Sequence, residues 1–428
     1  MPKTDDTIEL PEITVSDIDR CLQTGIFQKT FSGAACIASV GGRVFHRGVY
    51  GSLNQSPPLK KLDHQALFDL SSLTMPLGSG LAALKLASNN RLDLNASVNK
   101  TIPALRDKRF AKITIDMLLD HTSGLPAMRS YWKEVLEHDE GQIASQKVCG
   151  TQKAIELVQE MLSKTILEYE PGARTIYSDI GFLILGWIIE GVVGKPLDVF
   201  LAREIFQPLG IADDLFFVRL DDPRQRQWLY RRPFVATEEC EWREKMIIGE
   251  VHDPNAWCVG GVAGHCGLFG TADAVWKLVH AMWSSYRGES REFLGGTVRR
   301  FWTRSRRLRD TTRTLAWDTP SSLGSSCGKR FSKTSVGHTG YTGTSIWIDL
   351  STDVIGVVLT NAIHPTREGK TEKMEELWPR IYELIAKHGE AQPRDPEHKT
   401  GAAAFSSGPG TTVPLNNPTR GPGKPSGW

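Results

Sequence analysis

The sequence predicts an α+β protein in which a mostly helical segment is inserted into a sheet-forming domain. Strand hairpins are indicated near both ends of the chain, at residues 34–50 and 344–361, by apolar runs flanking short turns. Helical periodicity dominates residues 71–310 between them. Strands at both ends with helices between them indicate one domain, built from about residues 16–70 and 311–388, that carries the helical insertion.

A helix is predicted at the start of the first sheet-forming segment, over residues 16–30. Ser16 is a good N-cap residue, and Ile18, Leu22 and Ile26 follow at helical spacing. A hairpin comes next, in which Gly41-Gly42 supplies the tight turn between AACIASV and RVFHRGVY.

The second sheet-forming segment contains another hairpin and a closing helix. TSIWIDL and VIGVVLTN are the predicted strands, with a turn at Ser351–Asp353. The helix is expected at about residues 371–387, with a kink at Pro379. From residue 389 to 428 the chain is rich in Gly, Pro, Ser and Thr, so we expect a disordered tail after a folded domain of residues 16–388.

Composition and charge narrow the classes of function. The chain has 428 residues and a net charge of +2, which gives no electrostatic reason to expect nucleic acid or a membrane as a partner. The chain has one cluster of arginines. A solvated helix face is the favoured interpretation of this cluster, and contact with an acidic ligand is the alternative. That cluster comprises Arg299, Arg300, Arg304, Arg306, Arg307, Arg309 and Arg313.

Cysteine usage and the absence of a targeting pattern predict a soluble, cytoplasmic protein. The seven cysteines are odd in number and form no C-x-x-C pair, which is typical of reduced thiols. The N-terminus is acidic and lacks an apolar signal-peptide core. The most apolar run, residues 180–193, is too short to cross a bilayer and predicts a buried helix. The oligomeric state is left open by the sequence.

The stretch FDLSSLTMPL, residues 68–77, has the form of a nucleophile segment. An apolar lead-in is followed by Ser72, and Leu73, Leu77 and Leu81 then mark a helix face. A serine at a helix N-terminus has a backbone N–H free to stabilise an oxyanion, although most serines there are simply caps. S-x-x-K strings occur elsewhere, at Ser97–Lys100, Ser130–Lys133 and Ser326–Lys329, but they lack this context and are interpreted as chance.

Two further stretches strengthen the interpretation of Ser72 as a nucleophile. Tyr177-Ser178-Asp179 opens a strongly apolar helix in IYSDIGFLILGW. His338-Thr339-Gly340 directly precedes a predicted core strand in VGHTGYTGTSIWID, where glycines would let a substrate lie along the strand.

In their order and spacing these three elements resemble the β-lactamase-related serine hydrolases. That family includes class C β-lactamases, D-alanyl-D-alanine peptidases, D-aminopeptidases and esterases, and its motifs are S-x-x-K, Y-x-N, and K-T-G or H-x-G. ITIDMLLDHTSGLP and GGVAGHCGLFGTADAVWKL are also similar to segments of this family. The resemblance covers about residues 20–388 and implies a β-lactamase/transpeptidase-like fold, an antiparallel sheet flanked by helices.

The resemblance also implies a set of roles. Ser72 would be the acylated nucleophile, Tyr177 the general base, and His338 would occupy the place of the lysine in K-T-G. Thr339, Gly340 and Asp179 would contact the substrate, and the backbone N–H groups of Ser72 and Tyr341 would form the oxyanion hole. The implied chemistry is acyl transfer on a small ester, amide or D-amino-acid-like substrate, with neither a metal nor an organic cofactor.

The sequence departs from the family pattern at two positions. Met75 stands where the family has the S-x-x-K lysine, so that the site lacks a proton-exchanging cation. Asp179 replaces the usual asparagine, which exchanges an amide for a carboxylate. Both changes should raise the pKa of Tyr177. Three explanations remain: an inactivated natural homologue, an engineered lysine-to-methionine variant, or an active enzyme whose proton shuttle has been rewired. The chain is therefore either a serine hydrolase, weakened or altered by Met75, or a catalytically inactive homologue that binds a ligand or partner.

Other histidines are weaker candidates. His252, Asp253 and His265 match no standard metal-ligand spacing, so a loop lining the cleft is the favoured interpretation. His121, in HTSGLP, is interpreted as structural.

Overall fold

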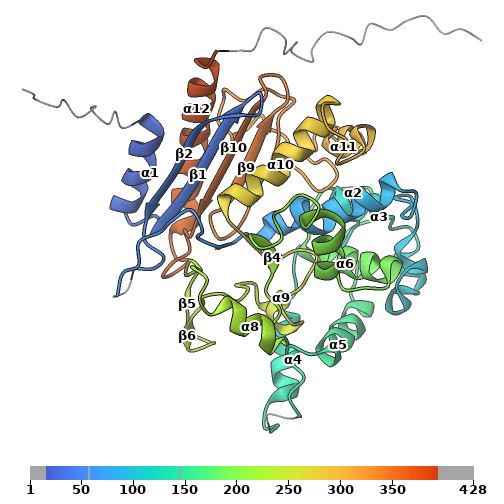
Figure 1. Cartoon of the computed structure of the whole chain (residues 1–428). Helices are drawn as coiled ribbons and strands as arrows, with labels where there is room; N and C mark the ends of the chain where they lie inside the picture. Colours follow the sequence, from blue (N-terminus) through green and yellow to red (C-terminus); the bar gives the residue numbers. More distant parts are fainter. Residues whose placement is uncertain (1–15, 56–57, 144–145, 394–428) are drawn as a thin grey trace, which may run out of the picture.

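The structure, a computed structural model, describes residues 16–55, 58–143 and 146–393. Its centre is a five-stranded antiparallel sheet in the order β2-β1-β10-β9-β8 (Figure 1). The strands are β1 (Gly33–Val40), β2 (Arg43–Gly51), β8 (Val336–Thr339), β9 (Ser345–Asp349) and β10 (Val354–Thr360). Strands from the two ends of the chain pair directly, since Ile37 of β1 lies opposite Val357 of β10. The predicted α+β, β-lactamase/transpeptidase-like fold is thereby confirmed.

Both predicted hairpins form because their turn residues accept a left-handed backbone. Gly41 and Gly42 have φ values of 54° and 76° between β1 and β2. Between β9 and β10 the same role falls to Asp353, with φ of 59°. Asp and Asn tolerate this conformation better than other residues that carry a Cβ.

The two faces of the sheet are covered by different helices. Side chains alternate along β1, so that Ala35 and Ile37 face one core and Cys36 and Ala38 face the other. On the second face lie α1 (Asp17–Phe27) and α12 (Lys370–Glu390), and α10 (Ala272–Arg287) packs against the first (Figure 1).

The terminal helices agree with the sequence pattern. Ser16 caps α1 in a capping box with Asp19, whose carboxylate accepts a hydrogen bond from the Ser16 backbone N–H at 2.8 Å. Pro379 lies inside α12, and the predicted tail begins where this helix ends. Residues 394–428 of that tail lie outside the described residues.

The inserted part is mostly helical. Its longer helices are α2 (Gly80–Ser88), α4 (Tyr131–Asp139), α5 (Gln152–Ser163), α6 (Asp179–Val193) and α11 (Gly295–Trp302). Shorter helices are α3 (Ile115–Leu119), α7 (Leu197–Leu201), α8 (Pro223–Leu229) and α9 (Pro254–Cys258). Short strands form two small sheets, one of β3 (Phe68–Asp69), β7 (Leu268–Gly270) and β4 (Leu215–Phe217), the other of β5 (Glu239–Cys240) and β6 (Lys245–Met246). In the described chain, then, the insertion also contains strands, and its helix α10 covers the central sheet.

The apolar run at residues 180–193 forms α6, most of which is buried in the main core, as predicted. Among the described helices, none alone is long and apolar enough to cross a membrane. Only α6 taken together with the bent segment Leu197–Phe206 reaches that length and composition, across a bend of 66°.

Candidate active site

Ser72 lies at a sharp elbow between β3 and a helical run. A 3-10 turn (Ser71–Leu73) and a π-helical turn (Met75–Ser79) lead from the elbow into α2. Ser71 has a positive φ of 49°, and Asp69 holds this strained turn. The buried Asp69 carboxylate accepts hydrogen bonds from the Ser71 backbone N–H at 2.8 Å and the His252 backbone N–H at 2.7 Å.

The turn between β8 and β9 packs directly on this elbow. The Thr342 hydroxyl donates to the Asp69 carbonyl at 2.8 Å, and the Thr344 hydroxyl donates to the Leu70 carbonyl at 3.1 Å. Gly340 comes so close that a Cβ there would lie 2.8 Å from the Leu70 carbonyl oxygen. The glycine of the His-Thr-Gly motif is therefore required for the approach of the sheet edge to the nucleophile segment.

A cleft of about 310 Å³ lies where the sheet edge meets the helical part. Its lining contains five of the residues predicted for the site, namely Ser72, Tyr177, His338, Thr339 and Tyr341. Four further residues, Arg313, Asp318, Ser326 and Trp347, complete the lining. Met75, Gly340 and Asp179 are not in this lining. None of the four further residues was predicted for the site, although Arg313 stood in the arginine cluster, Ser326 opened an S-x-x-K string interpreted as chance, and Trp347 lay in the predicted core strand.

Met75 contacts the predicted base directly. The side chain is fully buried, and the Tyr177 hydroxyl donates a hydrogen bond to its Sδ at 3.2 Å. Burial raises the pKa of Tyr177 well above its usual range; the Asp179 carboxylate raises it further, and the Ser72 side chain lowers it. The phenol is thus protonated at neutral pH, and of the two departures from the family pattern Asp179 is among the causes of the shift.

Arg313 supplies a positive charge in the cleft. Its guanidinium carbon lies 5.2 Å from the centroid of the Tyr177 ring, which is a cation–π distance. It is also paired with Asp318 at 3.5 Å, and both side chains are partly exposed. Of the residues that line the cleft within the described chain, Arg313 is the one permanent cation.

The arginine cluster is not a single helix face, contrary to the favoured interpretation. The helix α11 ends at Trp302, so only Arg299 and Arg300 belong to it. Arg307 turns inward and pairs with Asp116, at 2.6 Å, and with Asp120. The alternative interpretation, contact with an acidic ligand, fits Arg313, which is the last member of the cluster in the sequence.

His338 is held in one orientation within β8. Its Nδ1 donates to the Thr339 carbonyl at 2.8 Å, and its buried Nε2 has no hydrogen-bond partner among the described residues. Burial and the Arg313 charge lower the pKa of His338 to about 3. The imidazole is therefore neutral at physiological pH and does not replace the charge of the missing lysine.

Asp179 opens α6 behind the cleft. Its backbone N–H donates to the Ala127 carbonyl at 2.9 Å. Burial raises the pKa of its carboxyl to about 6; His265 opposes this shift and Asp253 adds to it. The Asp179 carboxylate thus interacts electrostatically both with the Asp253–His265 pair and with Tyr177 of the cleft lining.

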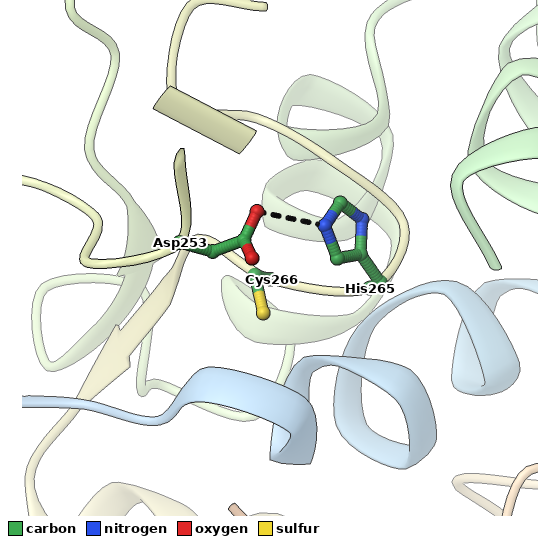
Figure 2. A group of neighbouring side chains, drawn as sticks. All are labelled: Asp253, His265 and Cys266. Atoms are coloured by element: carbon green, nitrogen blue, oxygen red, sulfur yellow. Dashed lines mark hydrogen bonds and ion pairs between the residues drawn. The ribbon is translucent and has the colours of Figure 1, made fainter. Parts of the chain in front are cut away.

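Asp253, His265 and Cys266 form a compact cluster, shown in Figure 2. Their ligand atoms lie within 4.8 Å of one another, and all three residue types can bind zinc. However, His265 Nε2 is already paired with Asp253 Oδ1 at 2.9 Å, and the same oxygen caps α9 by accepting from the Ala256 N–H. The pKa of His265 is raised above its usual value: burial lowers it, but the Asp253 carboxylate outweighs this effect. We therefore interpret the cluster as a buried ion pair that supports the site.

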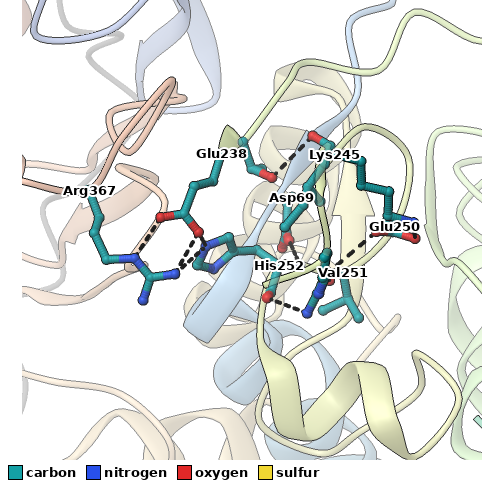
Figure 3. A network of polar contacts seen from close by, with 10 residues as sticks. Asp69, Glu238, Lys245, Glu250, Val251, His252 and Arg367 are labelled. Carbon is teal, nitrogen blue, oxygen red and sulfur yellow. Dashed lines mark hydrogen bonds and ion pairs between the residues drawn. The ribbon is translucent and has the colours of Figure 1, made fainter. Parts of the chain in front are cut away.

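His252 belongs to a charged platform beside the cleft (Figure 3). Its Nε2 lies 2.8 Å from Glu238 Oε2, and Arg367 binds the same carboxylate through two bonds of 2.6 and 2.5 Å. The Tyr341 ring stacks on the His252 ring, with 5.9 Å between the ring centroids. The Arg367 guanidinium carbon lies 6.0 Å from the centroid of the Tyr341 ring. His252 thus positions the Tyr341 side chain at the rim.

His121 supports Tyr177 from the other side. Its Nδ1 accepts a hydrogen bond from the Ser178 backbone N–H at 3.0 Å, and its ring lies 4.6 Å from the Tyr177 ring. Burial lowers its pKa well below the usual value. The structural interpretation made from the sequence agrees with these contacts.

Comparison with known proteins gives consistent matches. The β-lactamase family model matches residues 18–377. The chain is 31% identical over 364 residues to an N-acetylmuramyl-L-alanine amidase of Bacillus subtilis, covering 78% of each protein. It is 32% identical over 320 residues to a Salmonella typhi protein named as a putative D-alanyl-D-alanine carboxypeptidase, covering 70% of each. Among solved structures it resembles EstCE1, a hydrolase with promiscuous acyltransferase activity, with a TM-score of 0.64, 18% identity, and coverage of 85% of this chain and 97% of that one.

Proposed function

Since the chain belongs to the β-lactamase family, which contains serine hydrolases, we propose that it is an acyl-transferring serine hydrolase weakened by Met75. The observation that carries this proposal is the cleft in which Ser72 and Tyr177 meet the His338–Tyr341 strand end. In this arrangement the Ser72 Oγ attacks a substrate carbonyl, its proton passes by way of Tyr177 to the leaving group, and that group departs as an acyl-enzyme forms. Water then hydrolyses the acyl-enzyme.

The oxyanion hole is assigned to two backbone N–H groups. Neither the Ser72 nor the Tyr341 N–H donates to another protein group in the described chain, so both are available to a ligand. Two free donors beside a nucleophile are the usual means of stabilising a tetrahedral oxyanion. This supports Ser72 as the nucleophile independently of the missing lysine.

The methionine weakens proton transfer without closing the cleft. In place of an ammonium, the Tyr177 hydroxyl meets a thioether 3.2 Å away, which accepts weakly and exchanges no proton. Losing a positioned proton-transfer group typically costs about 10²–10⁴ in rate. We therefore propose slow acylation of Ser72 in a site whose shape is retained.

The substrate is proposed to be a small ester or amide that carries an anionic group. Arg313 is the cation in the lining, and its pairing with Asp318 is loose enough, at 3.5 Å, to be exchanged for a ligand carboxylate. A cleft of about 310 Å³ admits a small acyl group rather than a large polymer segment. The names of the relatives, an amidase and a carboxypeptidase, support amide or D-amino-acid-like substrates.

The alternative function is ligand binding without catalysis. The raised pKa of Tyr177 and the lowered pKa of His338 leave these two groups protonated and neutral, respectively, near pH 7. Neither has a pKa matched to accepting the Ser72 proton at that pH. This observation favours an inactive homologue that uses the same cleft to bind a ligand or partner.

We place the protein in the reducing cytoplasm. The seven cysteines are all free, which supports a compartment that keeps thiols reduced.

Covalent labelling separates hydrolase from binding module. The protein is incubated with a fluorophosphonate and, separately, with p-nitrophenyl acetate, and its intact mass is measured. We expect one adduct, mapped to Ser72 by peptide mass spectrometry, and no adduct in Ser72→Ala. If the folded protein acquires no adduct after prolonged incubation, the hydrolase proposal fails and the binding alternative stands.

A further inference from the structure

Two opposite charges face each other in the lining of the cleft. Arg313 and Asp318 both belong to it, with 3.5 Å between Arg313 Nη1 and Asp318 Oδ2. That separation is longer than the roughly 2.7–3.2 Å of an N–H···O hydrogen bond. The two side chains are 21% and 28% exposed, so solvent reaches both of them. The guanidinium and the carboxylate are therefore each open to a group of a ligand that enters the cleft.

The backbone fixes where these two charges lie. Arg313 and Asp318 are opposite residues of a short hairpin and are joined by an antiparallel bridge. The Asp318 backbone also exchanges hydrogen bonds with Gly337 of β8, at 2.8 and 2.9 Å. Near the tip of the hairpin, the buried Ala316 donates its backbone N–H to the Leu119 carbonyl at 2.9 Å. The segment that carries both charges is thus held in place before a ligand arrives, which lowers the entropy cost of binding.

A third group in the lining is an acceptor without a partner. Because the Nδ1 of His338 donates to the Thr339 carbonyl at 2.8 Å, its Nε2 is the acceptor nitrogen of the neutral ring. This Nε2 is buried and has no hydrogen-bond partner in the described chain. Buried acceptors are normally paired, so this one favours a ligand that brings N–H donors into the cleft. The lining thus offers two acceptors, on Asp318 and His338, as well as the Arg313 cation.

A ligand with a single charge matches only half of the Arg313–Asp318 pair. A carboxylate bound to Arg313 would lie beside the Asp318 carboxylate, and an ammonium bound to Asp318 would lie beside the Arg313 guanidinium. Such contacts between like charges disfavour binding. A neutral ligand would take solvent from both charges without replacing it. A ligand that carries both charges on neighbouring atoms satisfies the two side chains at once.

We propose that Arg313 and Asp318 form a subsite for a free α-amino-acid group, in which one carbon carries both an ammonium and a carboxylate. The carboxylate would bind the Arg313 guanidinium, and the ammonium would bind the Asp318 carboxylate. This inference rests on the proposed function, because it adds an ammonium to the anionic group proposed there for the substrate. Since both groups on the α-carbon are free, the ester or amide that Ser72 attacks lies in the side chain of the ligand.

Matched ligands measure the contribution of each charge. Binding to the full chain carrying Ser72→Ala, which cannot be acylated, is measured by isothermal titration calorimetry. The ligands are the two enantiomers of glutamine, glutaramic acid, which is glutamine without the ammonium, and 4-aminobutanamide, which is glutamine without the carboxylate. We expect one enantiomer of glutamine to bind at least about tenfold more tightly than either analogue, because only glutamine pairs with both side chains.

Asp318→Asn, made in the same background, separates a subsite from a structural effect. The change removes the charge but keeps an acceptor for the Thr319 backbone N–H, which lies 2.9 Å from Asp318 Oδ1. We expect glutamine to bind at least about tenfold more weakly. Glutaramic acid should bind at least as tightly as before, because Arg313 has lost its competing carboxylate. Asp310→Asn is the matched control, since Asp310 is exposed and lies outside the cleft lining.

Two outcomes would overturn the subsite. One is that neither enantiomer of glutamine binds better than its analogues, or that neither shows saturable binding up to about 10 mM. The other is that Asp318→Asn changes the affinities for glutamine and glutaramic acid equally, or changes neither. Labelling of Ser72 by a fluorophosphonate without glutamine binding would leave the hydrolase proposal standing and reject the subsite. Binding without labelling would do the reverse.

Discussion

At the scale of single residues, the side chain that meets the Tyr177 hydroxyl is the thioether of Met75. Its Sδ lies 3.2 Å from the phenol oxygen. A cation there would favour the ionised phenol, while a thioether leaves burial and Asp179 to raise the pKa of Tyr177. The remaining cation, Arg313, lies over the ring face rather than at the hydroxyl.

Restoring the lysine should therefore restore catalysis. Met75→Lys is expected to increase the rate of p-nitrophenyl acetate hydrolysis by at least about 100-fold, the size of a positioned proton-transfer group. Initial rates are measured at pH 7.5 for both proteins. The double variant Met75→Lys with Ser72→Ala should lose the gain. A folded Met75→Lys variant as slow as the parent would show that the assigned roles are wrong.

Asp179 makes the stability of the folded protein depend on pH. Its pKa in the folded protein is about 6, above its ordinary value of 3.8, so the fold favours the protonated carboxyl. This stabilisation is complete below about pH 4 and is lost as the pH rises through 6. The difference between 3.8 and about 6 corresponds to about 3 kcal/mol.

Asp179→Asn should remove that dependence. Compared with the parent, we expect the variant to have a similar free energy of unfolding at pH 4 and one that is higher by about 2–3 kcal/mol at pH 7.5. Urea denaturation at several pH values gives the difference between the two proteins at each pH, which cancels the other titrating groups. A difference that stays constant with pH would contradict a raised pKa for the partly buried Asp179.

At the scale of elements, the site depends on contact between the β3 elbow and the β8–β9 turn. Gly340 lies against the Leu70 carbonyl and Ser71, and the hydroxyls of Thr342 and Thr344 bind the backbone of the elbow. The turn therefore carries Tyr341 to the nucleophile through close backbone packing. A small added volume at this contact should separate the two halves of the proposed oxyanion hole.

Gly340→Ala is expected to disrupt the site. Its Cβ would lie 2.8 Å from the Leu70 carbonyl oxygen, so either backbone must move. We expect a loss of about 1–3 kcal/mol in stability, measured by thermal unfolding, and loss of Ser72 labelling. Gly191→Ala in α6 is the control: a Cβ at Gly191 would have nothing within 4 Å, so this change should leave stability unchanged or raise it slightly. Equal behaviour of the two variants would contradict the proposed packing.

At the scale of the whole molecule, the candidate active-site cleft forms where the inserted helical part meets the edge of the sheet. Ser72 and Tyr177 come from the insertion, and His338 comes from the edge strand β8. The buried Asn361 joins the sheet-forming part to the insertion. Its Oδ1 accepts hydrogen bonds from the Ser32 and Gly33 N–H groups, and its Nδ2 donates to the Ala236 carbonyl at 2.9 Å. These bonds link the sheet to the insertion.

Much of this arrangement could be predicted from local patterns. Ser16 with Asp19, the Gly41-Gly42 turn and the apolar face of α6 each form what the sequence indicated, because capping, left-handed turns and amphipathic spacing act over a few residues. Short motifs also singled out Ser72, Tyr177 and His338, which line one cleft; their catalytic roles stay predictions. The helix-face interpretation of the arginines failed because α11 ends at Trp302, where no clear stop signal stands.

By itself, the sequence determined the fold class and singled out three motif residues, whose catalytic roles and whose missing lysine at position 75 stay predictions. Only the tertiary structure decided that Arg313 lines the cleft, that His338 is neutral and that the Asp253–His265 pair acts on the charge of Asp179. The physical reason is distance along the chain. Motifs and periodicity record contacts between near neighbours. Burial and charge at the cleft instead arise from segments that are far apart in the sequence and meet only in the folded protein.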